Sequence, residues 1–348
     1  MLPKMENKRI AAACFDWLPR PDFRNPPSLV QALVLSFLPL IIIFVSQPLA
    51  VFGILGMPNS WFDVLVFDLD VYGLLREGKY ITGIGTLLAF VRPTIPGTSP
   101  KWLRQLFPAI AWFFFSDESK VYKDRHVGGS SETIVYVNGI CTTSRMARAT
   151  GMELAWMLHK DVTVVHNPTD SALMDLAECI FGKLWIGQNW TTSVPCSLVL
   201  QQLMVALLDV NKTKVVLIAH SQGTIIASDV LWLLWDAVNN GILPEVAMQK
   251  LEIYNLANAA QWMDQRNGYP YIENICNQCD NVGMLGANAP SLAKDLWNIS
   301  IAGDVIYPST KRWGHMIQAH YLEHLKKGDY GASKLHSYMK RKPRAHHN

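Results

Sequence analysis

The fold of this chain is decided by one stretch, KVVLIAHSQGTIIASDVLWLL, at residues 214–234. Residues 214–219 form a β-branched apolar run, which predicts a strand buried on both faces. Residues 222–239 are apolar on nearly every side and predict a buried helix. Ser221 stands in the polar turn between the two. A serine there either caps the helix or serves chemistry at the carboxyl end of the strand, where open α/β sheets place their sites.

The same alternation of strand and helix continues on both sides of this stretch. The patterns predict strands at 133–140, 161–169, 214–219, 250–256, 270–276 and 297–302, and helices at 144–158, 171–184, 197–209, 222–239, 258–266 and 315–327. Strands that alternate with helices of this length indicate an α/β fold, a mostly parallel sheet with helices on both faces.

Composition narrows the class of partner. The 348 residues carry a formal net charge of +3, and the basic residues form no stripe interleaved with aromatic ones, so nucleic acid is not expected as a partner. Cys276 and Cys279 form a single CxxC pair, which falls short of the four ligands of a structural zinc site. A disulfide and two plain thiols both remain open for this pair.

A long apolar segment near the amino terminus predicts a membrane anchor. Residues 28–57 contain no charged side chain and exceed the roughly 20 apolar residues that span a bilayer. Pro39 and Pro48 leave two forms open, a kinked single span and a hairpin that returns to the same side. Basic residues before the segment keep the amino terminus in the cytosol by the positive-inside tendency. A buried helix of a soluble protein is the alternative.

These patterns divide the chain into regions. We predict a polar tail at 1–27, the membrane segment at 28–57, a membrane-proximal region and linker at 58–130, an α/β domain at 131–330 with a helical insertion at 170–212, and a basic tail at 331–348.

The turn around Ser221 carries a catalytic motif. A tight strand-to-helix turn needs small residues two positions before and two after its serine, and Ala219 and Gly223 meet this need. The motif is a variant of the G-x-S-x-G nucleophile elbow. On this motif in its strand–turn–helix setting, the sequence resembles the α/β-hydrolase fold serine hydrolases of the lipase and esterase kind, over about residues 133–327.

The resemblance implies a triad in the order nucleophile, acid, histidine. Ser221 matches the nucleophile, and Asp280 matches the acid because it ends the predicted strand 270–276. Asp304 is the competing acid, although it stands only 11 residues before His315. His315, which follows a glycine, is the first choice for the base.

His320 is the alternative base. It lies about 140° from His315 on a helix, so both imidazoles cannot face the serine from regular helical turns. His324 is interpreted as structural, and His220 as packing beside the nucleophile or lining the pocket.

The resemblance also implies an oxyanion hole of backbone N–H groups. One donor is Gln222, which follows the nucleophile. The other is Ile140, with Cys141 as the next candidate, because Gly139 lets the backbone turn close to the substrate. The sequence VNG stands here where many lipase-like relatives have His-Gly, and this departure leaves the choice of donor open.

The sequence therefore predicts a membrane-associated serine hydrolase that cleaves a carboxylic ester or thioester, with a membrane lipid or acyl ester as substrate. The insertion at 170–212, with Trp185 and Trp190, is expected to form a lid or pocket wall. No metal or organic cofactor is needed for this chemistry. The alternative is a non-catalytic α/β-hydrolase-like membrane scaffold or binding protein. Which membrane holds the protein stays open.

Overall fold

The computed structural model describes residues 100–107, 109–111, 119–124, 131–140, 142–168, 179, 193–280, 282–291, 294, 295, 298–312 and 314–340. The predicted membrane segment at 28–57 lies outside these residues, as does all but residue 179 of the predicted helix at 171–184. Among the residues described, no helix has the length and hydropathy needed to cross a bilayer.

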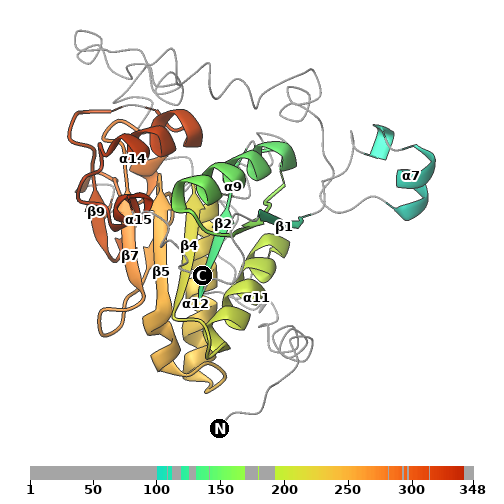
Figure 1. Cartoon of the computed structure of the whole chain (residues 1–348), viewed down its shortest axis with the longest axis horizontal. Coiled ribbons are helices and arrows are strands. Elements are labelled where there is room, and N and C mark those ends of the chain that lie inside the picture. The colour runs from blue at the N-terminus through green and yellow to red at the C-terminus, as the bar shows by residue number, and fades with distance from the viewer. Residues whose placement is uncertain are drawn as a thin grey trace, which may run out of the picture.

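A seven-stranded sheet forms the centre of the described structure (Figure 1). In spatial order its strands are β1 (Val121–Asp124), β3 (Val162–Val165), β2 (Glu132–Val137), β4 (Lys214–His220), β5 (Leu251–Leu256), β7 (Tyr271–Ile275) and β9 (Asp304–Ile306). All neighbours pair in parallel except β1, which is antiparallel to β3 at the edge. A separate parallel pair joins β6 (Trp262–Met263) to β8 (Ser300–Ile301).

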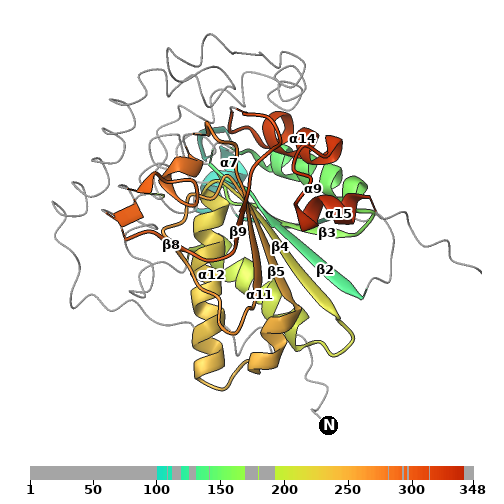
Figure 2. The ribbon, with the colours of Figure 1, turned by 90° about the vertical axis from the view of Figure 1, so that its left-hand side faces the viewer.

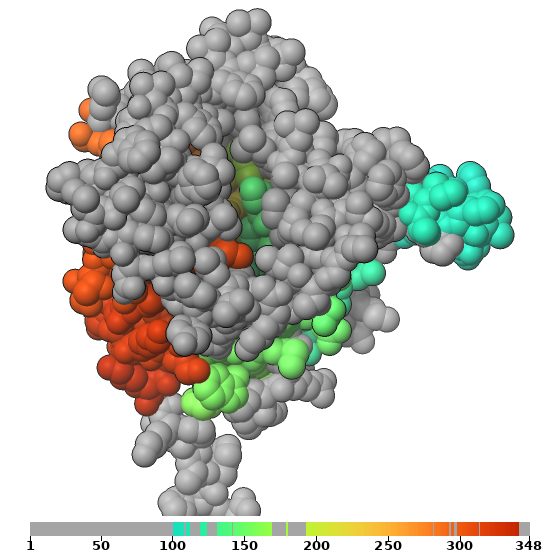
Figure 3. Space-filling model, turned by 90° about the horizontal axis from the view of Figure 1, so that it is seen from above, coloured from blue at the N-terminus to red at the C-terminus, as the bar shows by residue number. Residues whose placement is uncertain are grey.

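Helices cover both faces of this sheet (Figure 2). One face packs against α11 (Val194–Leu208) and α12 (Gln222–Asn239). The other packs against α9 (Ser144–Leu158), the π-helix η3 (Ile317–Leu322), α14 (Glu323–Lys327) and α15 (Lys334–Met339). The remaining described helices are α7 (Lys101–Leu106), η1 (Glu245–Lys250) and η2 (Gly283–Leu285). Seen from above, the carboxyl-terminal segment in red lies beside α9 in green (Figure 3). The predicted mostly parallel α/β fold is confirmed.

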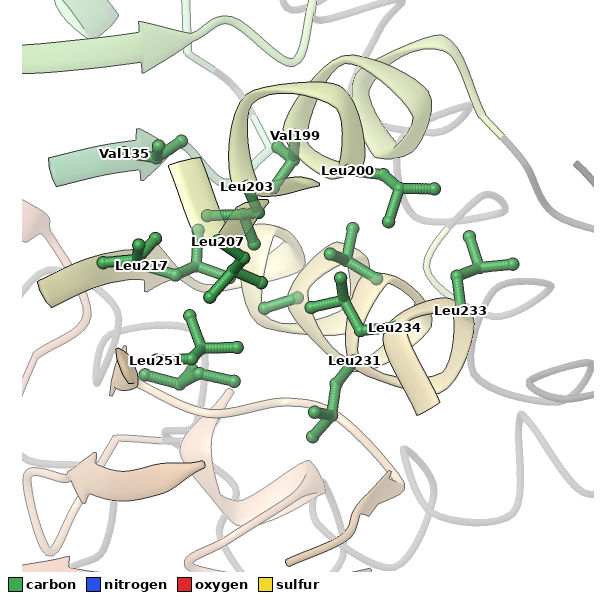
Figure 4. Close-up of a cluster of buried hydrophobic side chains, with 14 of the residues drawn as sticks. Val135, Val199, Leu200, Leu203, Leu207, Leu217, Leu231, Leu233, Leu234 and Leu251 are labelled. Atoms are coloured by element: carbon green, nitrogen blue, oxygen red, sulfur yellow. The ribbon is translucent and has the colours of Figure 1, made fainter. Parts of the chain in front are cut away.

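The strand β4 is central because both of its faces are apolar. Leu217 and Ala219 belong to the core under α11 and α12, whereas Val216 and Ile218 belong to the core on the α9 side. Figure 4 shows side chains from the strands and from the two helices meeting in the first of these cores, with Val135, Val199, Leu200, Leu203, Leu207, Leu217, Leu231, Leu233, Leu234 and Leu251 labelled. This double burial fixes the position of the turn that follows β4.

Two helices match their predicted bounds because strong local signals delimit them. The helix α9 begins after Thr143, whose hydroxyl accepts a hydrogen bond from the backbone N–H of Met146 at 3.3 Å. It ends at His159, which adopts the left-handed conformation with φ of 52°. The helix α12 spans the predicted 222–239 and begins directly after Ser221.

Three predictions of local structure are wrong. The predicted helix at 258–266 is a loop followed by β6, because residues 262 and 263 pair with β8. The predicted strand at 297–302 is not the last strand of the main sheet, since β9 follows it and begins at Asp304 itself. The predicted helix at 315–327 starts two residues later as a π-helix, which leaves His315 in the preceding loop.

Candidate active site

Ser221 occupies a sharp turn between β4 and α12. Its φ of 56° and ψ of −124° lie outside the regions that non-glycine residues favour, a conformation that costs about 1–3 kcal/mol. Within the described chain, its side chain makes no hydrogen bond to the first turn of α12. Thr224 bonds that turn instead, since its hydroxyl donates to the backbone oxygen of Ser221 at 2.6 Å. The helix-cap interpretation of Ser221 is therefore wrong.

Two glycines make room for this turn. A Cβ atom on Gly139 would lie 2.5 Å from the Cβ of Ser221 and 3.0 Å from its Oγ. A Cβ atom on Gly223 would lie 2.6 Å from the backbone oxygen of Val137. The loop after β2 thus packs directly against the serine, and neither position has space for a side chain.

The structure brings Ser221, His315 and Asp280 into one hydrogen-bonded chain. The Nε2 atom of His315 lies 2.9 Å from Ser221 Oγ. Its Nδ1 atom lies 2.9 Å from Oδ2 and 3.1 Å from Oδ1 of Asp280. All three side chains are buried, and Asp280 is fully so. Because a carboxylate only accepts, the Nδ1–H of His315 donates to Asp280, and Nε2 is left to accept from the serine hydroxyl.

Asp280 is held as a carboxylate. Its Oδ1 accepts from the backbone N–H of Val282 at 2.9 Å and of Gly283 at 3.3 Å, and its Oδ2 accepts from the hydroxyl of Tyr321 at 2.6 Å. Burial alone would raise the pKa of Asp280, but the charge of His315 and these hydrogen bonds lower the pKa below its ordinary value. A permanent negative charge therefore faces the imidazole of His315.

His220 packs against His315 from the end of β4. The two rings stack with centroids 4.8 Å apart, and the Nε2–H of His220 donates to the backbone oxygen of His315 at 2.9 Å. Burial, followed by the neighbouring His315, lowers the pKa of His220 to about 3. His220 is therefore neutral at physiological pH and anchors the loop that carries His315.

Replacing His220 with glutamine is expected to weaken the acid sensitivity of the fold. The folded-state pKa of about 3 lies below the ordinary 6.5, so between these values the unfolded chain binds one more proton than the folded chain. Stability is then lost as pH falls from 6.5 toward 3, at about 1.4 kcal/mol per pH unit. Urea unfolding at several pH values in this window should give His220→Gln a slope smaller by about one proton. An unchanged slope would contradict this account.

His320 and Asp304 are placed elsewhere. The Nδ1 atom of His320 accepts from the backbone N–H of Met316 at 3.0 Å, and its ring lies where a Cβ on Gly314 would stand 2.5 Å away. His320 thus supports the loop of His315. Asp304 is exposed and begins β9, in register with Glu273 inside β7, whereas Asp280 follows the carboxyl end of β7. The imidazole at Ser221 is that of His315, and the carboxylate beside it is that of Asp280.

The predicted oxyanion donors lie on the two segments that meet at the serine. Gln222 is the first residue of α12, and Ile140 lies in the loop after β2. Cys141 lies outside the described residues. The first N–H groups of a helix have no acceptor inside the helix and point along its axis, a geometry that suits an anionic oxygen.

A buried amide network joins these segments. The side-chain NH2 of Asn138 donates to the backbone oxygens of Asn167 at 2.8 Å and Gly139 at 2.9 Å. In return, the backbone N–H of Asn167 donates to Asn138 Oδ1 at 3.0 Å, and its side-chain NH2 donates to Gln222 Oε1. The ends of β2 and β3 and the start of α12 are therefore fixed relative to one another beside Ser221.

Three contributing side chains were not identified from the sequence: Asn138, Asn167 and Tyr321. A buried asparagine at a strand end is a usable signal for the first two, because a buried amide must find partners. For Tyr321 the sequence offers no signal, since its contact with Asp280 spans 41 residues. His324 bonds Asp329 through Nδ1 at 2.7 Å, which agrees with a structural role.

The remaining candidate groups do not form a metal centre. No set of three or more His, Cys, Asp or Glu side chains with metal-binding geometry occurs among the described residues. Cys276 and Cys279 are both buried as thiols rather than joined in a disulfide.

The serine in a strained turn between a central parallel strand and a helix, followed along the chain by acid and histidine, is the arrangement of an α/β-hydrolase-like fold. Two solved structures are similar to this chain. Esterase LipW from Mycobacterium marinum has 13% sequence identity and a TM-score of 0.30, over 64% of this chain and 83% of its own. Alpha/beta hydrolase domain-containing protein 10 from mouse has 14% identity and a TM-score of 0.31, over 61% of this chain and 93% of its own.

No protein-family model matches the sequence, and no curated protein matches it. At the identities and TM-scores of the two solved structures, neither activity nor substrate transfers to this chain.

Proposed function

We propose that this protein is a serine hydrolase that cleaves a carboxylic ester or thioester through an acyl-enzyme. The observation that carries the proposal is the hydrogen-bonded chain from Ser221 Oγ through His315 to the buried carboxylate of Asp280. A serine hydroxyl attacks poorly without an adjacent base and an orienting acid, and this chain supplies both.

In the first half of the proposed reaction, Ser221 Oγ attacks the substrate carbonyl carbon while His315 Nε2 takes the hydroxyl proton. Asp280 holds the ring in the required tautomer and stabilises the imidazolium that forms. His315 then gives the proton to the leaving alcohol or thiol as the bond from carbon to that group breaks. In the second half, water is activated by His315, attacks the acyl carbon and releases the acid and Ser221.

The oxyanion of each tetrahedral intermediate is proposed to bind the backbone N–H of Gln222 and that of Ile140, with Cys141 as the next candidate. The amide network of Asn138, Asn167 and Gln222 supports this assignment, because it fixes both donor segments before the substrate arrives. Donors that are already in place cost no reorganisation when the charge develops, and one such donor is worth about 2.7–4 kcal/mol.

We propose a lipid or acyl-chain substrate at a membrane, on the strength of the uncharged segment 28–57 and of Trp185 and Trp190 in the insertion. Alkaline carbonate extraction of membranes from cells that express the full chain tests the anchor. Retention in the membrane pellet is expected. Release into the supernatant would overturn the integral anchor and leave the proposed chemistry untouched.

Hydrolysis of model substrates tests the proposed reaction. The full chain is expected to hydrolyse p-nitrophenyl esters and an acyl-thioester, with kcat/KM rising from short to long acyl chains because a longer chain buries more apolar surface. A folded protein that turns over none of these substrates would favour the non-catalytic scaffold. Faster turnover of short chains than of long ones would overturn the lipid assignment alone.

A further inference from the structure

Tyr321 makes the one side-chain contact to Asp280 that comes from neither His315 nor the acid's own loop. Its hydroxyl donates to Asp280 Oδ2 at 2.6 Å and accepts from the backbone N–H of Asn277 at 3.2 Å. The side chain is completely buried. Burial, and then the charge of Asp280, raise the pKa of Tyr321 far above its ordinary value, so the hydroxyl stays protonated and remains a donor.

The oxygen that Tyr321 contacts also serves His315. Oδ2 of Asp280 accepts from Tyr321 at 2.6 Å and lies 2.9 Å from His315 Nδ1. Two donors that share one carboxylate oxygen compete for the same negative charge. The hydroxyl therefore weakens the charge that the imidazole experiences, in addition to fixing the orientation of the carboxylate.

A second tyrosine holds this arrangement in register. The rings of Tyr321 and Tyr330 stack with centroids 6.4 Å apart, and the Tyr330 hydroxyl donates to Asn277 Oδ1 at 2.6 Å. The side-chain NH2 of Asn277 donates to the backbone oxygens of Gly314 at 3.0 Å and His320 at 3.1 Å. The loop that carries Asp280 and the loop that carries His315 are thus joined through Asn277.

We propose that Tyr321 is a positioning residue, which orients the carboxylate of Asp280 and moderates its charge so that His315 is deprotonated, and able to act as base, at neutral pH. This inference rests on the proposed hydrolase function. The titratable groups packed around the pair of Asp280 and His315 are His220 from β4, Cys276 after β7, His320 and Tyr321 from η3, and Tyr330. Of these, Tyr321 donates directly to the carboxylate.

The test measures how fast a fluorophosphonate probe labels Ser221 as a function of pH, which reports the ionisation of the base without requiring the natural substrate. In Tyr321→Phe the ring and its stacking remain, but Asp280 presents more charge to His315 and favours the imidazolium. The inflection of the labelling rate is expected to move to higher pH by about 0.5 unit, with a several-fold lower plateau rate. An inflection equal to that of the wild type would overturn the inference.

Tyr254→Phe is the matched control. Tyr254 is also completely buried, and its hydroxyl also donates to a carboxylate, that of Glu252 at 2.8 Å on β5. Its removal is expected to lower stability without moving the inflection. An equal shift in this control would show a general effect of destabilisation and would overturn the inference. If Tyr321→Phe does not fold, difluorotyrosine at position 321, a stronger donor, should move the inflection to lower pH, and an unmoved inflection would overturn the inference.

The same experiment separates the two proposals. A wild type that is not labelled at Ser221 overturns the proposed function, and this inference with it. A wild type that is labelled, together with an unshifted Tyr321→Phe profile, overturns this inference alone.

Discussion

Replacing Ser221 with alanine is expected to lower kcat for ester hydrolysis by on the order of 10⁴- to 10⁶-fold. The change removes the only atom that can form the proposed acyl-enzyme, whereas the turn and its two glycines remain. The melting temperature should change little, because Ser221 makes no cap bond to α12 and alanine is no better suited to its φ of 56° than serine. Initial rates and thermal unfolding measure the two effects.

Ser228→Ala is the matched control for this substitution. Ser228 lies on α12 two turns beyond Ser221, is completely buried, and donates to the backbone oxygen of Trp262. Its loss should cost about 1 kcal/mol of stability and leave kcat near that of the wild type. If Ser221→Ala were as active as Ser228→Ala, the proposed nucleophile would be wrong.

Replacing His315 with alanine is expected to lower kcat by on the order of 10⁴-fold or more. The substitution removes the proposed base 2.9 Å from Ser221 Oγ and leaves the carboxylate of Asp280 buried without its main partner. Stability should therefore also fall, by about 1–3 kcal/mol. Steady-state kinetics and urea unfolding measure both consequences.

His320→Asn separates the two histidines that the sequence offered as the base. Asparagine keeps a short side-chain acceptor in place of the Nδ1 atom that accepts from Met316 N–H. We expect a loss of about tenfold or less, because His320 supports the loop of His315 without taking part in the proton transfer. A larger loss in His320→Asn than in His315→Ala would reverse the assignment of the base.

The parts of the fold that were predicted correctly are those with strong local signals. β4 shows an apolar run on both faces, and α12 follows it with an apolar surface of helical period. The helix α9 carries its cap residue in the sequence. Ser221, between these signals, was identified because its surroundings on both sides were readable.

The failures occurred where non-local pairing overrides local pattern. Residues 258–266 have a helical composition, but Asn258 turns the chain by accepting from the backbone N–H of Ala260 at 2.8 Å. The backbone N–H of Ser300 then donates to the oxygen of Gln261, and β6 pairs with β8. β9 contains only three residues, too few for a periodic signal, and its place beside β7 is set by the sheet.

At the site, the chain order of serine, acid and histidine was informative, but the choice between close candidates was not fixed by pattern. Asp304 is separated from Asp280 by the strand end that each occupies, which requires knowledge that Asp304 begins β9. His315 and His320 are separated by a loop and a π-helix, and the sequence predicted one regular helix across both. Tyr321 was missed because its role depends entirely on this tertiary arrangement.

The most direct test of the account is phosphonylation of the folded full chain by a fluorophosphonate, followed by mapping of the modified residue by mass spectrometry. The probe reacts with a serine only when a base and oxyanion donors activate it. The account predicts one modified residue, Ser221, and no modification after heat denaturation. An unmodified folded protein, or a modification at a different serine, would contradict it.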